Sequence, residues 1–76
     1  LAITHAAVSA ITGSGTLDAA ELRAAGDAPN GAHLVYDQDS GVLSYDALGD
    51  GSSLSTLVTL LNNHALLASE ITILPA

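Results

Sequence analysis

The stretch that most constrains the fold is residues 34–51, LVYDQDSGVLSYDALGDG, in which two Tyr-Asp steps each close a short apolar segment. Two segments in and beside it, residues 33–36 and 42–45, alternate with period two and predict a pair of strands. The five-residue loop between them, DQDSG, ends in a glycine that can take the left-handed conformation such a loop needs. The pattern therefore predicts an antiparallel β-hairpin with Tyr36 and Tyr45 on its core side.

The segments that precede the hairpin predict two further elements. Residues 2–8, AITHAAV, alternate in character and predict a short strand. Residues 17–25 carry a modest apolar stripe at helical spacing, and Thr16 and Gly26 are suitable residues to begin and end a helix there. We therefore expect one short helix near residues 17–25.

The segments that follow the hairpin are less uniform. Residues 54–61, LSTLVTLL, fit a helix by the spacing of their leucines and a strand by their threonines and valine, so both remain open. Asn62-Asn63 predicts a break in the chain, residues 65–70 a turn of helix, and residues 71–74 a terminal strand. The expected fold class is α+β, mainly β: a small β-rich domain made of the hairpin, flanking strands and one short helix.

Length and composition limit how such a domain can be stabilised. A chain of 76 residues buries only about 60 to 65% of its unfolded surface, and this one has no Phe, Trp, Met or Cys to fill a core. Small domains of this kind usually need a disulfide, a metal or a neighbouring domain. The absence of Cys leaves a metal, or neighbouring domains or copies. Because the chain begins with Leu1, we expect residues 1–76 to be a single module of a larger secreted or surface protein.

The charge of the chain indicates which partners to expect. The formal net charge is −7, and Arg23 is the only Lys or Arg. Nucleic acid and anionic membranes require clustered basic residues, so we expect neither as a partner. No apolar run approaches the roughly 18 residues of a membrane span, so no membrane insertion is expected. Arg23 can pair with one of the acids, and an exposed pair contributes only about 0 to 1 kcal/mol.

The acidic hairpin suggests calcium as the counterpart of this charge. Calcium takes six to eight oxygen ligands from carboxylates and carbonyls on tightly bending loops. The candidate ligands, which we expect to converge on folding, are Asp37, Asp39, Asp46, Asp50 and backbone oxygens near Gly49. The same residues are equally typical of turns with Asx hydrogen bonds, and that interpretation stays open. An EF-hand loop starting at Asp37 is excluded, because its sixth position would be Val42 and its twelfth Leu48.

Other sites have weaker support. His5, His33 and His64 lack the local spacing of zinc ligands and would form a zinc site only if folding brought all three together. We expect His33 in a strand and His64 in a loop. No G-x-S-x-G motif is present, and a chain of this size has little room for a substrate pocket. We therefore expect no enzymatic activity in this segment.

The order of the motifs resembles a known family. LDAAEL, the hairpin VYDQDSGVLSYDALGDG and the ending ALLASEITIL are similar to the C-terminal module of RTX-type proteins, the hemolysin-type calcium-binding family of bacteria. The resemblance covers residues 17–74. Leu48 departs from it, because the family usually has an aspartate there, and Leu22 and Ile71 replace phenylalanines. The family's nonapeptide repeats are absent from this sequence. The matching hairpin positions are Tyr36, Asp37, Gly41, Leu43, Tyr45, Asp46, Gly49 and Gly51.

The resemblance implies a non-catalytic module of a secreted bacterial protein, exported by a type I system, that folds with calcium outside the cell and caps a parallel β-roll. It is also compatible with the tail of a secreted protease or lipase. A structural unit of an adhesin, surface layer or filament is the alternative. In that case residues 2–8 and 71–74 would pair between copies as exposed edges.

Overall fold

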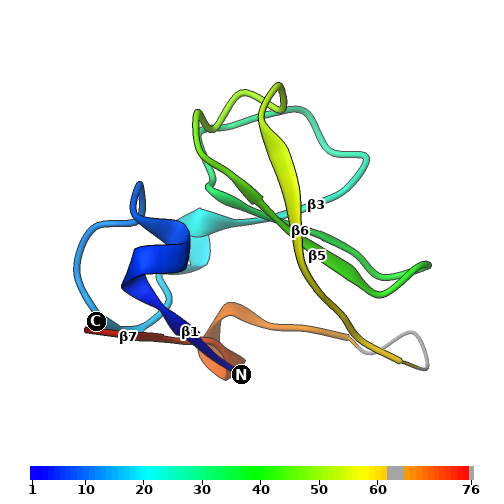
Figure 1. The fold of residues 1–76 in the computed structure, drawn as a ribbon. Helices are drawn as coiled ribbons and strands as arrows, with labels where there is room; N and C mark the ends of the chain where they lie inside the picture. Colours follow the sequence, from blue (N-terminus) through cyan, green and yellow to red (C-terminus); the bar gives the residue numbers. More distant parts are fainter. Residues whose placement is uncertain (62–64, 76) are drawn as a thin grey trace.

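The computed structural model describes residues 1–61 and 65–75 and shows two small mixed sheets packed against each other (Figure 1). The first sheet has the strand order β3 (Leu22–Ala24), β4 (Leu34–Asp37), β5 (Val42–Asp46) and β6 (Leu54–Thr59). The second has the order β1 (Ala2–Thr4), β7 (Thr72–Leu74) and β2 (Gly15–Thr16). The helical elements are single 3-10 segments: η1 (His5–Val8), η2 (Ala19–Glu21) and η3 (Ala68–Glu70). The predicted small β-rich fold is confirmed.

The hairpin forms as its alternation predicts. Strands β4 and β5 are antiparallel, with Leu34 opposite Tyr45 and Tyr36 opposite Leu43. Gly41 has a φ of 78°, the left-handed conformation expected at the end of the loop. Tyr36 is buried, whereas Tyr45 is half-buried and its hydroxyl accepts a 2.8 Å hydrogen bond from the amide of Ala10. Both tyrosines therefore lie on the core side, and Tyr45 also ties β5 to the residues after η1.

The helix predicted over residues 17–25 is wrong in extent and in its cap. Only η2 is helical, and the chain then enters β3, which pairs in parallel with β4 through Leu22 opposite Leu34. Asp18, not Thr16, caps η2, because its side chain accepts a 3.1 Å hydrogen bond from the amide of Ala20. A nine-residue helix is marginal without strong packing, so pairing with a buried strand outweighs a weak helical stripe.

The segment over residues 54–61 fits both a helix and a strand by its sequence, and it forms strand β6 over Leu54–Thr59. Its antiparallel pairing with β5 contains an irregularity near Leu43 and Ser44, where the register shifts by one residue. Strand β6 is an edge of its sheet, and in the described part of the chain no strand pairs with its outer side. The break predicted at Asn62-Asn63 and the loop predicted at His64 lie outside the described residues.

The two terminal segments pair with each other, so that β7 has a partner on both sides and, of the two, only β1 remains at an edge. The predicted strand over residues 2–8 is shorter than expected, because β1 gives way to η1 at His5. Strands β1 and β7 are parallel, with Ile3 opposite Ile73, and β2 adds to the other side of β7. The expectation that residues 2–8 and 71–74 both offer exposed edges is therefore wrong, since β7 is the central strand. Central placement satisfies its backbone groups on both sides.

The core lies between the two sheets and is built from aliphatic residues and one tyrosine. Leu34, Leu43 and Ile71 are fully buried within it. No helix among the described residues is long and apolar enough to cross a membrane. The buried core cluster as a whole consists of Ile3, Val8, Ile11, Leu17, Leu34, Tyr36, Leu43, Ile71 and Ile73.

Candidate functional site

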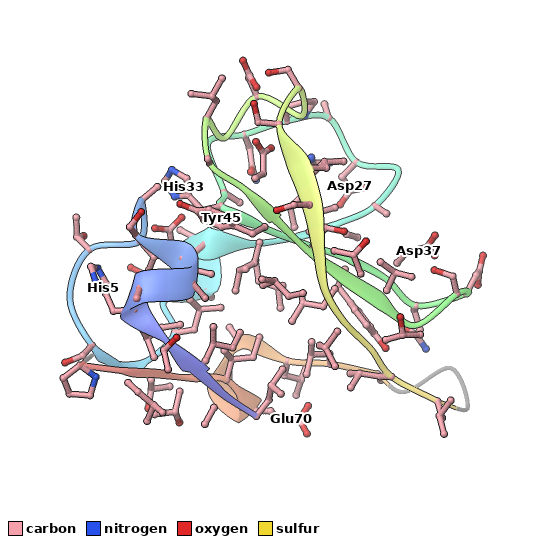
Figure 2. The ribbon with its side chains drawn as sticks, viewed as in Figure 1. His5, Asp27, His33, Asp37, Tyr45 and Glu70 are labelled. Atoms are coloured by element: carbon pink, nitrogen blue, oxygen red, sulfur yellow. The ribbon has the colours of Figure 1, made fainter. Side chains whose placement is uncertain are left out.

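The predicted calcium ligands lie in two separate loops. Asp37 is opposite Val42 at the tip of the β4–β5 hairpin, whereas Asp46 ends β5 at the other end of the strand. A strand advances about 3.3 Å per residue, so these two ends are about 13 Å apart. Figure 2 shows Asp37 beside that tip, away from the loop that follows β5. The expected convergence of the four aspartates is therefore wrong: one pair lies at each end of the strand that separates them.

Asp46 is the centre of the loop that follows β5. Its side chain is fully buried. One carboxylate oxygen, Oδ1, accepts a 3.0 Å hydrogen bond from the amide of Gly49, and Oδ2 accepts a 2.7 Å hydrogen bond from the amide of Gly51. A carboxylate that accepts backbone N–H groups in this way makes charge-assisted hydrogen bonds that hold the loop closed. We call Asp46, Gly49, Gly51 and Arg23 the Asp46 lock.

Arg23 supplies the charge that this buried carboxylate needs. It is only 7% exposed, so the expectation of an exposed ion pair is wrong. Its Nη2 lies 3.9 Å from Oδ2 of Asp46, and its Nη1 donates a 2.8 Å hydrogen bond to the carbonyl of Asp27. Burying one member without the other would leave an uncompensated charge, which typically costs about 3 to 5 kcal/mol. The one Arg of the sequence is therefore committed to the interior of the fold.

A close backbone contact completes the loop. The amide of Gly31 donates a 3.1 Å hydrogen bond to the carbonyl of Gly49. Gly49 has a φ of 70°, and a Cβ atom at this position would lie 2.8 Å from the carbonyl oxygen of Gly31. The amide of Asp46 donates a 2.8 Å hydrogen bond to the carbonyl of His33. The loop after β5 is thus fixed against the segment before β4 by backbone contacts that only glycine permits at position 49.

The tip of the hairpin is more open. Asp37 is half-buried, and its Oδ1 accepts hydrogen bonds from the amides of Asp39 (3.1 Å) and Ser40 (3.4 Å). Asp39 is exposed. Both aspartates line a depression of about 360 Å³ that Tyr36 and Leu66 also border. Asp37 thus forms the Asx turn that the sequence left open as an alternative, while the acidic pair remains accessible from solvent.

Asp50 lies on the surface beyond the Asp46 lock. Its Oδ1 accepts a 2.6 Å hydrogen bond from the hydroxyl of Ser52 and a 3.0 Å hydrogen bond from the amide of the same residue. These bonds, the hydroxyl first, lower the pKa of Asp50 below its ordinary value of 3.8. Nearby Leu48, at the position where the resembling family has an aspartate, is 65% exposed. The side chain of Leu48 therefore faces solvent and is not part of the buried core.

The histidines have separate roles. His5 contacts the carbonyl of Ile11 through Nε2 at 2.8 Å, and His33 contacts Oε1 of Glu21 through Nδ1 at 2.7 Å. His33 precedes β4 directly, and His64 lies outside the described residues. Across residues 1–61 and 65–75, no group of three or more His, Cys, Asp or Glu side chains is placed to hold a metal ion.

The bonding of the Asp46 carboxylate explains why the Asp46 lock does not resemble a calcium site. Both oxygens of Asp46 already accept amide hydrogens, and the nearest charged neighbour is a guanidinium, which repels a cation. The residue that sequence reasoning missed is Arg23 as the partner of Asp46. The available signal was its status as the single strong cation among eight acids.

Comparison with protein-family models, with curated proteins and with solved structures finds no match to this chain. The fold and the geometry of its two acidic loops therefore carry the functional argument.

Proposed function

We propose that this chain is a non-catalytic folding and capping module of a secreted bacterial protein of the RTX type, which its sequence resembles. The supporting observation is that the motif residues behind the resemblance are used to build the fold. Leu43 and Asp46 are fully buried, and Tyr36 nearly so. Residues of the motif that pack in the core and close a loop have a structural role, and such a role is expected in a module that acts by folding.

The glycines of the motif support the same proposal. Gly41 and Gly49 both have positive φ, and a Cβ atom at either position would meet the backbone of another segment, Leu60 and Gly31 respectively. The amide of Leu60 also donates a 2.6 Å hydrogen bond to the carbonyl of Gly41. These glycines therefore serve close backbone approach, and we assign them to folding rather than to ligand binding.

Calcium enters the proposal as an aid to folding that acts on the open acids. Arg23 is the one Lys or Arg of the sequence and is committed to Asp46, so no Lys or Arg is left to offset the repulsion among the exposed carboxylates. Asp37 and Asp39 are the first candidates, because they are close together and border an accessible depression. Asp46 belongs to the closed loop and is not the residue through which we expect calcium to act.

The test is a thermal melt in excess chelator and across a calcium series, with magnesium and sodium chloride as controls. Binding to the native state at about a hundredfold excess over Kd should add roughly 2.7 kcal/mol to the free energy of unfolding. The variant pair Asp37→Asn with Asp39→Asn should abolish a calcium-specific rise. Asp18→Asn with Asp27→Asn is the matched control, since it removes the same charge from exposed positions elsewhere.

The outcomes separate the parts of this proposal. A rise specific to calcium that only the hairpin pair abolishes supports calcium-assisted folding. An equal rise with magnesium or sodium chloride contradicts calcium specificity and indicates general screening of charge. A flat series from a folded domain contradicts calcium assistance altogether.

One observation favours assembly as a second candidate function. Strand β6 is an open edge, and residues 51–61 contain no Asp, Glu, Lys or Arg although the chain carries a net charge of −7. Charged residues normally protect an edge from pairing with another strand. If copies assemble through β6, sedimentation should show concentration-dependent association that Thr56→Lys prevents. A monomer at all concentrations would contradict this candidate.

A further inference from the structure

The sequence contains two places where an Asn or Asp precedes glycine, and the fold brings both to the Asp46 lock. These steps are Asn30-Gly31 and Asp50-Gly51. They are 20 positions apart in the chain, yet Gly31 contacts Gly49 and Gly51 contacts Asp46. The two steps of the chain in which an Asn or Asp precedes glycine are therefore held by one small cluster of hydrogen bonds.

The chemistry of such a step is intramolecular. The backbone nitrogen of the glycine loses its proton and attacks Cγ of the preceding side chain, which closes a five-membered succinimide ring. Ammonia leaves when the residue is Asn, and water leaves when it is Asp. A water molecule then opens the ring at either carbonyl and yields aspartate or isoaspartate. Glycine favours the reaction because it has no Cβ to hinder the approach.

The structure opposes the first step at both glycines. The amide of Gly31 donates a 3.1 Å hydrogen bond to the carbonyl of Gly49, and the amide of Gly51 donates a 2.7 Å hydrogen bond to Oδ2 of Asp46. A hydrogen bond to an acceptor stabilises the protonated amide. A buried negative carboxylate next to Gly51 further disfavours the amide anion that would have to form.

The side chains that would be attacked are also engaged. Oδ1 of Asn30 accepts a 3.1 Å hydrogen bond from the amide of Ala32. Oδ1 of Asp50 accepts hydrogen bonds from both the amide and the hydroxyl of Ser52. Each Cγ is thereby restricted in rotation while the loop is closed, although both residues are exposed to solvent.

We propose that Asn30-Gly31 and Asp50-Gly51 are sites of spontaneous succinimide formation that the closed Asp46 lock keeps unreactive and that its opening releases. An isoaspartate adds a methylene to the backbone, so a chain modified at position 30 cannot place Gly31 opposite Gly49 as before. Opening of the Asp46 lock is itself reversible, but an isoaspartate that forms while the lock is open is a permanent change of the backbone. The modification marks chains that fold late or incompletely.

The primary test uses the unmodified chain incubated in mildly alkaline buffer, with and without urea, beside a peptide of residues 26–37 as the unprotected reference. Mass spectrometry follows the conversion of Asn30 to aspartate, and electron-transfer fragmentation identifies isoaspartate at position 50. We expect conversion at both sites to be at least about tenfold slower in the folded chain than in urea, in line with local opening of a protected loop. Equal rates of Asn30 conversion in the folded chain and in the peptide, or equal rates of Asp50 conversion with and without urea, would overturn the proposal.

Two further measurements separate the lock from folding in general. Hydrogen exchange on the folded chain should show protection of the Gly31 and Gly51 amides, and exchange as fast as in an unstructured peptide would overturn the assignment. Asp46→Ala should raise the conversion rate at both sites towards that of the unfolded chain, whereas Asp39→Ala should leave it unchanged. If Asp46→Ala stays folded by circular dichroism with an unchanged rate, the lock is not what protects the two steps.

Discussion

The loop after β5 and the tip of the β4–β5 hairpin are made of the same residue types, aspartate, serine and glycine, yet they differ in burial and in partners. In the loop, Asp46 is fully buried and bonded through both oxygens. At the tip, Asp39 is exposed and Asp37 makes only a local Asx turn. The difference shows that the environment of an aspartate, more than the motif around it, decides whether it holds the fold together or remains available to a cation.

The strongest challenge to this comparison is to remove one aspartate from each region. Asp46→Ala leaves Arg23 buried without its counter-charge and removes the side-chain acceptor of the Gly51 amide, so we expect a loss of about 3 to 5 kcal/mol in the free energy of unfolding. Asp39→Ala, at an exposed position, should change it by no more than about 0.5 kcal/mol. Urea denaturation measures both. Similar losses for the two variants would show that the distinction between loop and tip is wrong.

A glycine substitution tests whether the tip is loose throughout. Gly41→Ala forces an alanine into a φ of 78° and directs its Cβ at the carbonyl of Leu60, so we expect a loss of at least about 2 kcal/mol. Gly26→Ala, with a φ of 108° and open space around the added Cβ, should cost about 1 to 2 kcal/mol, from backbone strain alone. Differential scanning calorimetry gives both values. If Gly26→Ala proves the more harmful, the contact of the tip with Leu60 contributes little.

The smallest expected effect concerns the exposed acid beyond the lock. Ser52→Ala removes the hydroxyl that lowers the pKa of Asp50, so this pKa should rise towards its ordinary value of 3.8. The pKa of Asp50 is lower in the folded chain than in the unfolded chain. The contribution of Asp50 to stability is therefore complete at a pH above its ordinary pKa, and it is lost as the pH falls through the lowered pKa. Carbon-detected NMR titration of Asp50 measures the shift. Ser53→Ala is the control, and an equal change in that variant would exclude the hydroxyl as the cause.

The sequence predicts the hairpin well because its signals are local. Alternation sets the faces of β4 and β5, and the glycine at the end of the loop sets the turn, so Tyr36 lies on the core side as expected. The ambiguity over residues 54–61 could not be resolved in this way. Strand β6 forms because β5 offers it an edge to pair with, which is information that no window of sequence contains.

The features that the sequence misses depend on contacts between distant residues. Residues 17–25 carry a helical stripe, but Leu22 finds a strand partner in Leu34 after a long connection. Arg23 meets Asp46 only after β3, β4 and β5 have come together in one sheet. Convergence of the aspartates is expected from their place on one hairpin and its following turn, but β5 lies between the two pairs and keeps them apart.

The parallel pairing of β1 with β7 has a mechanical consequence. The two strands run in the same direction with Ala2 beside Thr72 and Thr4 beside Leu74, and the two ends of the chain leave this pair in opposite directions (Figure 1). Tension applied to the two ends of the chain would slide the strands along each other and load their hydrogen bonds together instead of breaking them one at a time. A pull that enters and leaves through the termini would therefore meet its first resistance at this small sheet, before it reached the hairpin or the buried ion pair.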